Sequence, residues 1–151
     1  MDIFPSSPGR ASPEPEAASP APAGFGPGNT PYDALGGDAR VRALVDAFYD
    51  HMDADPDAAG IRGLHQADLA NARTKLHEFL SGWLGGPPLY VEKYGHPRLR
   101  GRHMPFPIAE AERDQWLTCM ERAMDDLAID GELRRFLDAR FAHVANFMRN
   151  Q

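Results

Sequence analysis

The chain has 151 residues and a formal net charge of −6 at pH 7. This length suits one domain, and the acidic balance argues against nucleic acid as a partner, because nucleic-acid binders need a basic face. No apolar run is long enough to cross a bilayer, so we expect a soluble protein without a membrane partner.

Residues 1–29 predict a disordered tail. The first 31 residues contain eight of the fourteen prolines. They show almost no apolar periodicity, so they cannot bury enough surface to offset the entropy lost on ordering. A cleaved signal peptide is not expected, because the cationic start and the apolar run are both missing. Residues 30–151 are enough for one hydrophobic core.

Two amphipathic helices are predicted in the first half of this domain. Apolar residues recur at helical spacing from Val41 to Met52, with Asp38 expected as the N-cap and an end near Pro56. A second pattern runs from Leu69 to Leu84 and stops at the Gly-Gly-Pro-Pro sequence of residues 85–88.

Two more helices follow an irregular connection. Residues 89–94 are short and ambiguous, and residues 95–107 carry too many glycines and prolines for more than one or two helical turns. In the third helix, the apolar residues between Trp116 and Leu127 recur at helical spacing and share one face. The fourth, capped by Asp130, extends from Leu133 to Met148. No segment alternates with a period of two over a useful length, so the predicted fold class is all-α.

Cys119 is the one cysteine of the chain. A single cysteine excludes an internal disulfide and fits a reducing, cytoplasmic compartment. Its place on the third helix predicts a buried and inert thiol.

The six histidines are the first candidates for chemistry. The sequence contains neither His-Glu-x-x-His nor Cys-x-x-Cys, and no His/Glu pairing across several helices, which leaves little support for zinc-hydrolase or di-iron sites. His51, His77 and His143 are expected at the surface or at its boundary.

His103 differs from these because of its neighbours. Haem iron in globins is held by one neutral imidazole, whose other ring nitrogen donates to a carbonyl or carboxylate. An irregular segment can orient an imidazole freely, and it has backbone carbonyls that are not used in a helix. Arg98, Arg100 and Arg102 supply guanidinium groups suited to haem propionates, and Phe106 can pack on the macrocycle. From spacing alone, a basic surface loop in which His103 only packs remains an equal alternative.

Two polar aromatic residues lie on the predicted buried faces: Tyr49 on the first helix and Trp116 on the third. The phenol and the indole need a hydrogen-bond partner when buried. Indole only donates, whereas phenol both donates and accepts. Two such donors in an apolar cavity suit a bound diatomic ligand, although ordinary core aromatics are the alternative.

Taken together, these residues resemble the group II truncated haemoglobins. The matching motifs run in the family's order and spacing, at residues 31–37, 48–49, 83–87, 95–106 and 112–117. The Arg-His-x-Pro-Phe sequence of residues 102–106, with Trp116 thirteen residues after His103, is highly specific for group II.

The resemblance implies a shortened globin fold, a two-over-two helical sandwich around haem b. His103 matches the proximal iron ligand. Arg102 matches the cation that commonly contacts a propionate, and Lys75 and Tyr90 are weaker candidates for the same contact.

On the distal side, Tyr49 matches the family's distal tyrosine and Trp116 the tryptophan of groups II and III. Ala72 falls where classical globins place the distal histidine, and Leu76 follows one turn on, against the cofactor. His65 is a departure, since many group II members have Tyr or Phe there. We expect His65 in the distal pocket, as a third polar group that titrates near neutral pH, with a solvent-facing side chain as the alternative.

The implied function is reversible binding of dioxygen and other diatomic ligands, such as nitric oxide, with high oxygen affinity. Two donors to the ligand predict slow oxygen release. The alternative is a haem enzyme for nitric oxide dioxygenation or peroxide reduction, with a reductase as partner. A small helical binding module without haem is a third possibility. The sequence leaves the oligomeric state, monomer or homodimer, open.

Overall fold

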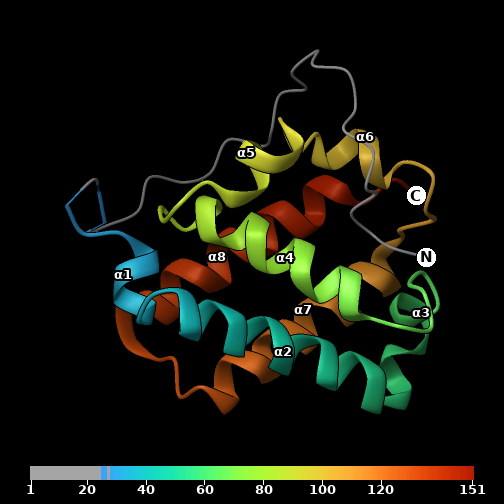
Figure 1. The fold of residues 1–151 in the computed structure, drawn as a ribbon. Helices are drawn as coiled ribbons and strands as arrows, with labels where there is room; N and C mark the ends of the chain where they lie inside the picture. Colours follow the sequence, from blue (N-terminus) through green and yellow to red (C-terminus); the bar gives the residue numbers. More distant parts are fainter. Residues whose placement is uncertain (1–24, 27) are drawn as a thin grey trace.

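The computed structural model describes residues 25–26 and 28–151, with the side chain of Arg100 left out. The predicted tail, residues 1–29, therefore lies almost wholly outside the described residues. Within the described part, the helices follow one another as α1 (Pro31–Leu35), α2 (Asp38–Ala54), the 3₁₀ turn η1 (Pro56–Ala58), α3 (Ala59–Arg62), α4 (Ala70–Trp83), α5 (Leu89–Tyr94), α6 (Leu99–His103), α7 (Glu110–Asp126) and α8 (Gly131–Met148) (Figure 1).

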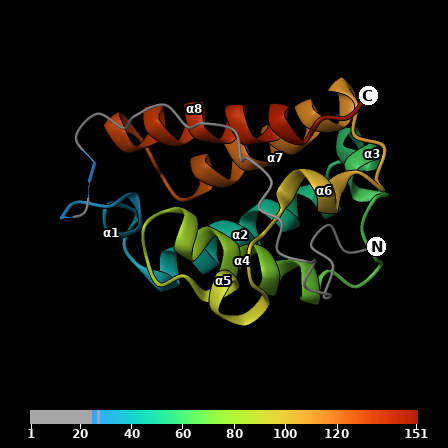
Figure 2. The same cartoon turned by 90° about the horizontal axis from the view of Figure 1, so that it is seen from above.

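The four long helices form two layers of two. Helices α7 and α8 make one layer and α2 and α4 the other, as the view in Figure 2 shows. Helix α2 packs against α4 within its layer and against α7 across the interface. The described residues contain no β-sheet, which confirms the predicted all-α class. None of the described helices combines the length and the apolar character that crossing a bilayer requires.

The apolar faces that predicted the long helices form the core between the layers. Val41, Leu44 and Phe48 of α2 are 0% exposed, as is Met120 of α7. Cys119 is also buried, as predicted, and burial raises the pKa of its thiol to about 11. The core thus uses one face of each long helix, and each layer shields the other.

The start of α2 differs from the prediction. Its N-cap is Gly37 rather than Asp38, and Asp38 is the first helical residue. The φ angle of Gly37 is 87°, a left-handed value that glycine adopts without steric cost. Asp38 still favours the helix, because its carboxylate lies at the positive end of the helix dipole. The predicted cap of the fourth helix, Asp130, is confirmed as the N-cap of α8.

A tight turn after α4 sets the position of α5. Gly85 has a φ of 96°, and a Cβ atom there would lie 2.9 Å from the Cβ of Thr30. At Gly82, a Cβ would lie 3.0 Å from the Cα of Pro88. The hydroxyl of Ser81 donates to the carbonyl of Pro87 over 2.8 Å. Residues without side chains therefore let the turn pack closely against α1 and against the end of α4.

Candidate functional site

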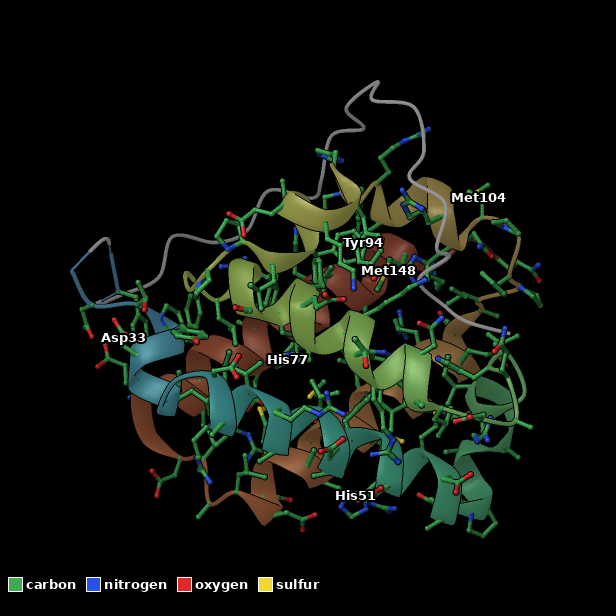
Figure 3. All side chains as sticks on the ribbon, viewed as in Figure 1. Asp33, His51, His77, Tyr94, Met104 and Met148 are labelled. Atoms are coloured by element: carbon green, nitrogen blue, oxygen red, sulfur yellow. The ribbon has the colours of Figure 1, made fainter. Side chains whose placement is uncertain are left out.

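A mainly apolar hollow lies between the two helical layers. It leaves about 20 Å³ of room for the centres of water-sized molecules, within about 400 Å³ of space between protein atoms that includes its opening to solvent. Met148, which Figure 3 labels at the end of α8 behind α4, belongs to its wall. The full lining comes from α2, α4, α6, α7 and α8, and consists of Tyr49, Leu76, Phe79, Leu80, Trp83, Leu99, His103, Trp116, Phe141, Val144 and Met148.

His103, the last residue of α6, is the one imidazole in this wall. Its side chain is buried, and its Nδ1 lies 2.5 Å from the carbonyl oxygen of Leu99, one helical turn earlier. A carbonyl can only accept, so Nδ1 carries the proton and Nε2 keeps its lone pair. Burial is the main reason that the pKa of His103 falls to about 4. At neutral pH this residue is therefore a neutral imidazole in a fixed tautomer.

Two polar aromatics complete the hollow. Tyr49 of α2 is 1% exposed and Trp116 of α7 is 9% exposed, and both line the same space as His103. The ring of Phe48 lies between them, with its centroid 4.9 Å from that of Tyr49 and 5.1 Å from that of Trp116. Edge-on packing of this kind fixes ring orientation. The phenol and the indole are thus held by one shared neighbour.

His65 is buried beside Tyr49 but is not part of the wall. Its Nδ1 lies 3.0 Å from the carbonyl oxygen of Ile61, and the centroid of its ring lies 5.7 Å from that of Tyr49. The N–H of Ile61 in turn donates to the side chain of Gln115 on α7 over 2.8 Å. Helix α3 is therefore tied to α7 at the point from which it orients His65.

Two cations are buried near the hollow. Lys75 on α4 is 1% exposed, and its Nζ lies 5.6 Å from the centre of the Tyr94 ring. Arg102, next to His103, is 8% exposed. Tyr90 is also buried and contacts the ring of Phe79 edge-on, with centroids 6.2 Å apart. Lysine and arginine are seldom buried this deeply unless they serve a charged partner.

The structure brings only some of the predicted site residues to the wall of the hollow. Tyr49, Leu76, His103 and Trp116 line it. The other predicted residues are buried without lining it, namely His65, Ala72, Lys75, Tyr90, Arg102 and Phe106.

Several wall residues were not predicted as part of the site. Most lie on the apolar helical faces, and periodicity cannot separate a core contact from a cavity wall. Leu99 gave no signal at all, because it lies in the glycine- and proline-rich connection. The unpredicted wall residues are Phe79, Leu80, Trp83, Leu99, Phe141, Val144 and Met148.

Two of the histidines expected near the surface, His51 and His77, pair with carboxylates. His51 lies 2.6 Å from Asp126, and His77 lies 2.7 Å from Asp38. His77 is less exposed than expected: its side chain is 15% accessible, because α4 turns it toward the start of α2 (Figure 3). Both imidazoles connect pairs of helices.

This set of groups fits haem. A planar apolar ring system suits a slot walled by aromatic and aliphatic side chains. Its iron needs a neutral imidazole, which His103 provides, and its carboxylates suit the buried ammonium and guanidinium of Lys75 and Arg102.

Comparisons with known proteins agree with this geometry. The profile of the family described as bacterial-like globin matches residues 30–150. The group 2 truncated hemoglobin YjbI of Bacillus subtilis is 43% identical over 123 residues, which cover 82% of this chain and 90% of that protein.

Solved structures give the same result. The group II 2-on-2 hemoglobin from Agrobacterium tumefaciens superposes with a TM-score of 0.78 at 51% identity, covering 81% of this chain and 95% of the other. The truncated oxygen-avid haemoglobin from Bacillus subtilis gives a TM-score of 0.75 at 43% identity, and the match covers 81% of this chain and 100% of the other. With its two-on-two helices, this chain belongs to the bacterial-like globin family, as a group II truncated haemoglobin, and so to haem proteins that bind diatomic gases such as oxygen.

Proposed function

We propose that this protein holds haem b through His103 and binds dioxygen reversibly with high affinity, with nitric oxide and other diatomic gases as further ligands. One observation carries the proposal. A neutral imidazole and two polar aromatic side chains, Tyr49 and Trp116, line the same hollow.

His103 is the proposed iron ligand. Its bond to the Leu99 carbonyl fixes the ring and leaves the Nε2 lone pair for a metal. Because burial keeps the imidazole neutral, no proton has to leave before the metal binds. The haem iron supplies the centre at which a diatomic gas is reversibly held.

The buried cations are the proposed partners of the propionates. Arg102 and Lys75 each offer N–H donors to a carboxylate, and the hydroxyl of Tyr90 offers one more. A carboxylate also offsets the cost of burying each positive charge. Leu76 and Phe79 give the slot apolar walls that exclude water, and Phe106 and Ala72 are proposed to pack around them.

Tyr49 and Trp116 are the proposed hydrogen-bond donors to the gas. The indole N–H can only donate, so it favours a ligand whose outer atom accepts. Tyr49 adds a second donor, which lowers the rate of ligand release. His65 lies outside this wall; with its Nδ1 bonded to the Ile61 carbonyl, its Nε2 is the acceptor nitrogen of the ring.

Absorption spectra of the purified protein test the proposal in the ferric, ferrous and oxygenated states. We expect the wild type to take up haemin stoichiometrically and to form a stable oxygenated state. His103→Ala should lose or weaken the spectrum, whereas His51→Ala, which removes a surface imidazole from α2, should match the wild type. A colourless wild type that takes up no haemin would overturn the proposal.

A second candidate is turnover of nitric oxide or peroxide with a reductase as partner. The observation that favours it is His65, an additional imidazole buried against Tyr49. Steady consumption of nitric oxide by the reduced protein with a reductase would support the enzyme. A single stoichiometric reaction would support the carrier.

A further inference from the structure

The segment that follows His103 cannot satisfy its own backbone. A continuing helix would place the N–H of residue 107 against the carbonyl of His103, but residue 107 is proline and has no N–H. Pro105 removes another donor. The N–H of Phe106 reaches the His103 carbonyl at 2.9 Å, in a single turn that does not continue. Residues 104–108 therefore need donors from elsewhere to hold one conformation.

Asn150, just after α8, supplies these donors. Its Nδ2 donates to the carbonyl of Phe106 over 2.8 Å and to the carbonyl of His103 over 3.2 Å. Its Oδ1 accepts from the N–H of Ile108 at 3.0 Å, and its own N–H donates to the Ile108 carbonyl at 2.9 Å. Both ends of the side-chain amide are used, and only one orientation of the amide satisfies all three side-chain bonds.

The end of α8 is itself anchored. Arg149 contacts the carboxylate of Glu110 at 2.9 Å, and the side-chain oxygen of Asn146 accepts from Arg113 at 3.0 Å. Glu110 and Arg113 lie in the first turn of α7, the helix that carries Trp116. Figures 1 and 2 both show this end of the chain next to α6. Asn150 thus ties the segment after His103 to the α7–α8 layer.

We propose that Asn150 is a positioning residue for the proximal ligand. It fixes the backbone of His103 from the side of α8, while the Leu99 carbonyl fixes the imidazole from within α6. The inference rests on the proposed function, because it assigns to His103 the task of holding the iron. Nothing in the argument requires Asn150 to touch haem.

Three variants of the haem-loaded full chain separate positioning from packing. Asn150→Ala removes all three side-chain bonds. Asn150→Asp keeps the volume and the acceptor toward Ile108, but it places an oxygen opposite the carbonyls of His103 and Phe106. Gln151→Ala is the matched control, since it removes an amide from the residue next to Asn150, where the side chain is exposed.

Two readouts report on the iron–histidine bond. One is the iron–histidine stretching band of the ferrous, ligand-free protein in resonance Raman spectra. The other is the rate at which haemin transfers to an excess of apomyoglobin. We expect a shifted or broadened band and about tenfold faster haemin loss in both Asn150 variants, since Asp removes two of the three side-chain hydrogen bonds and Ala removes all three. Gln151→Ala should match the wild type in both readouts.

The outcomes are distinct. If Asn150→Asp keeps the wild-type band and haemin-loss rate, the side chain only fills space and the inference is wrong. If Asn150→Ala does not fold, as judged by circular dichroism, the Asp variant alone decides. If the wild type takes up no haemin, the proposed function has failed and the inference falls with it.

Discussion

Trp116 and Tyr49 differ in the hydrogen bonds that their polar groups can make to a ligand in the hollow. Both are buried and share Phe48 as a neighbour, but the indole has a donor and no acceptor. Its contribution to ligand retention therefore depends on one N–H group. The phenol can also turn its hydrogen toward another acceptor, so its effect is harder to isolate by a single substitution.

Trp116→Phe tests the indole directly. The substitution keeps an aromatic ring and removes the N–H, and one hydrogen bond to a charged acceptor is worth about 1.5–3 kcal/mol. We expect oxygen dissociation, measured by stopped-flow mixing with a ligand scavenger, to accelerate at least several-fold. Carbon monoxide, a weaker acceptor, serves as the control ligand and should change less. An unchanged oxygen off-rate would show that Trp116 makes no bond to the ligand.

At the scale of elements, the turn after α4 decides how α1 and α5 meet the rest of the fold. Thr30 caps α1 by accepting from the N–H of Asp33 at 3.1 Å, and its side chain lies only 2.9 Å from where a Cβ on Gly85 would be. Close approach and a left-handed backbone therefore coincide at one glycine. Two costs follow from adding a methyl group there, one conformational and one steric.

Gly85→Ala should destabilise the apoprotein by about 1–3 kcal/mol, measured by urea unfolding. Gly95→Ala is the matched control, because Gly95 also has a positive φ of 81° and a Cβ there would meet nothing within 4 Å. This control variant carries only the conformational cost, so its free energy of unfolding should fall by less than that of Gly85→Ala. Equal losses would mean that Thr30 moves aside without cost.

The sequence predicts the long elements well and the short ones poorly, for a physical reason. The predicted stripes correspond to α2, α4, α7 and α8, because each spans several turns and repeats its apolar face. Helices α1 and α3 have five and four residues, too few for a period to repeat. The prediction of Asp38 as the N-cap of α2 is wrong because Gly37, one residue earlier, makes the turn into the helix and needs no side chain to do so.

At the scale of the whole molecule, the site is a gap between two layers rather than a local motif. His103 and Trp116 stand out in the sequence because of the residues around them and their spacing. Phe141 and Met148 do not, since a residue facing the hollow and a residue facing the core carry the same apolar signal. Only the packing of α8 over α4 separates the two.

Because the hollow divides the layers, filling it should stabilise the whole fold. A ligand that binds only the native state raises the Tm, and a concentration near 1,000 times the Kd gives roughly 10–20 °C for a domain of this size. We expect such a rise with haemin, and a smaller one with iron-free protoporphyrin IX, which fills the slot but offers no metal to His103.

The difference between the two porphyrins isolates the iron–histidine bond. In His103→Ala, haemin and protoporphyrin IX should raise the Tm equally, because the bond that distinguished them is gone. Differential scanning calorimetry of the four combinations gives this comparison as a double-mutant cycle, free of the packing that both porphyrins share. If haemin keeps its full advantage in His103→Ala, another side chain holds the iron, and the role proposed for Asn150 would lose its basis.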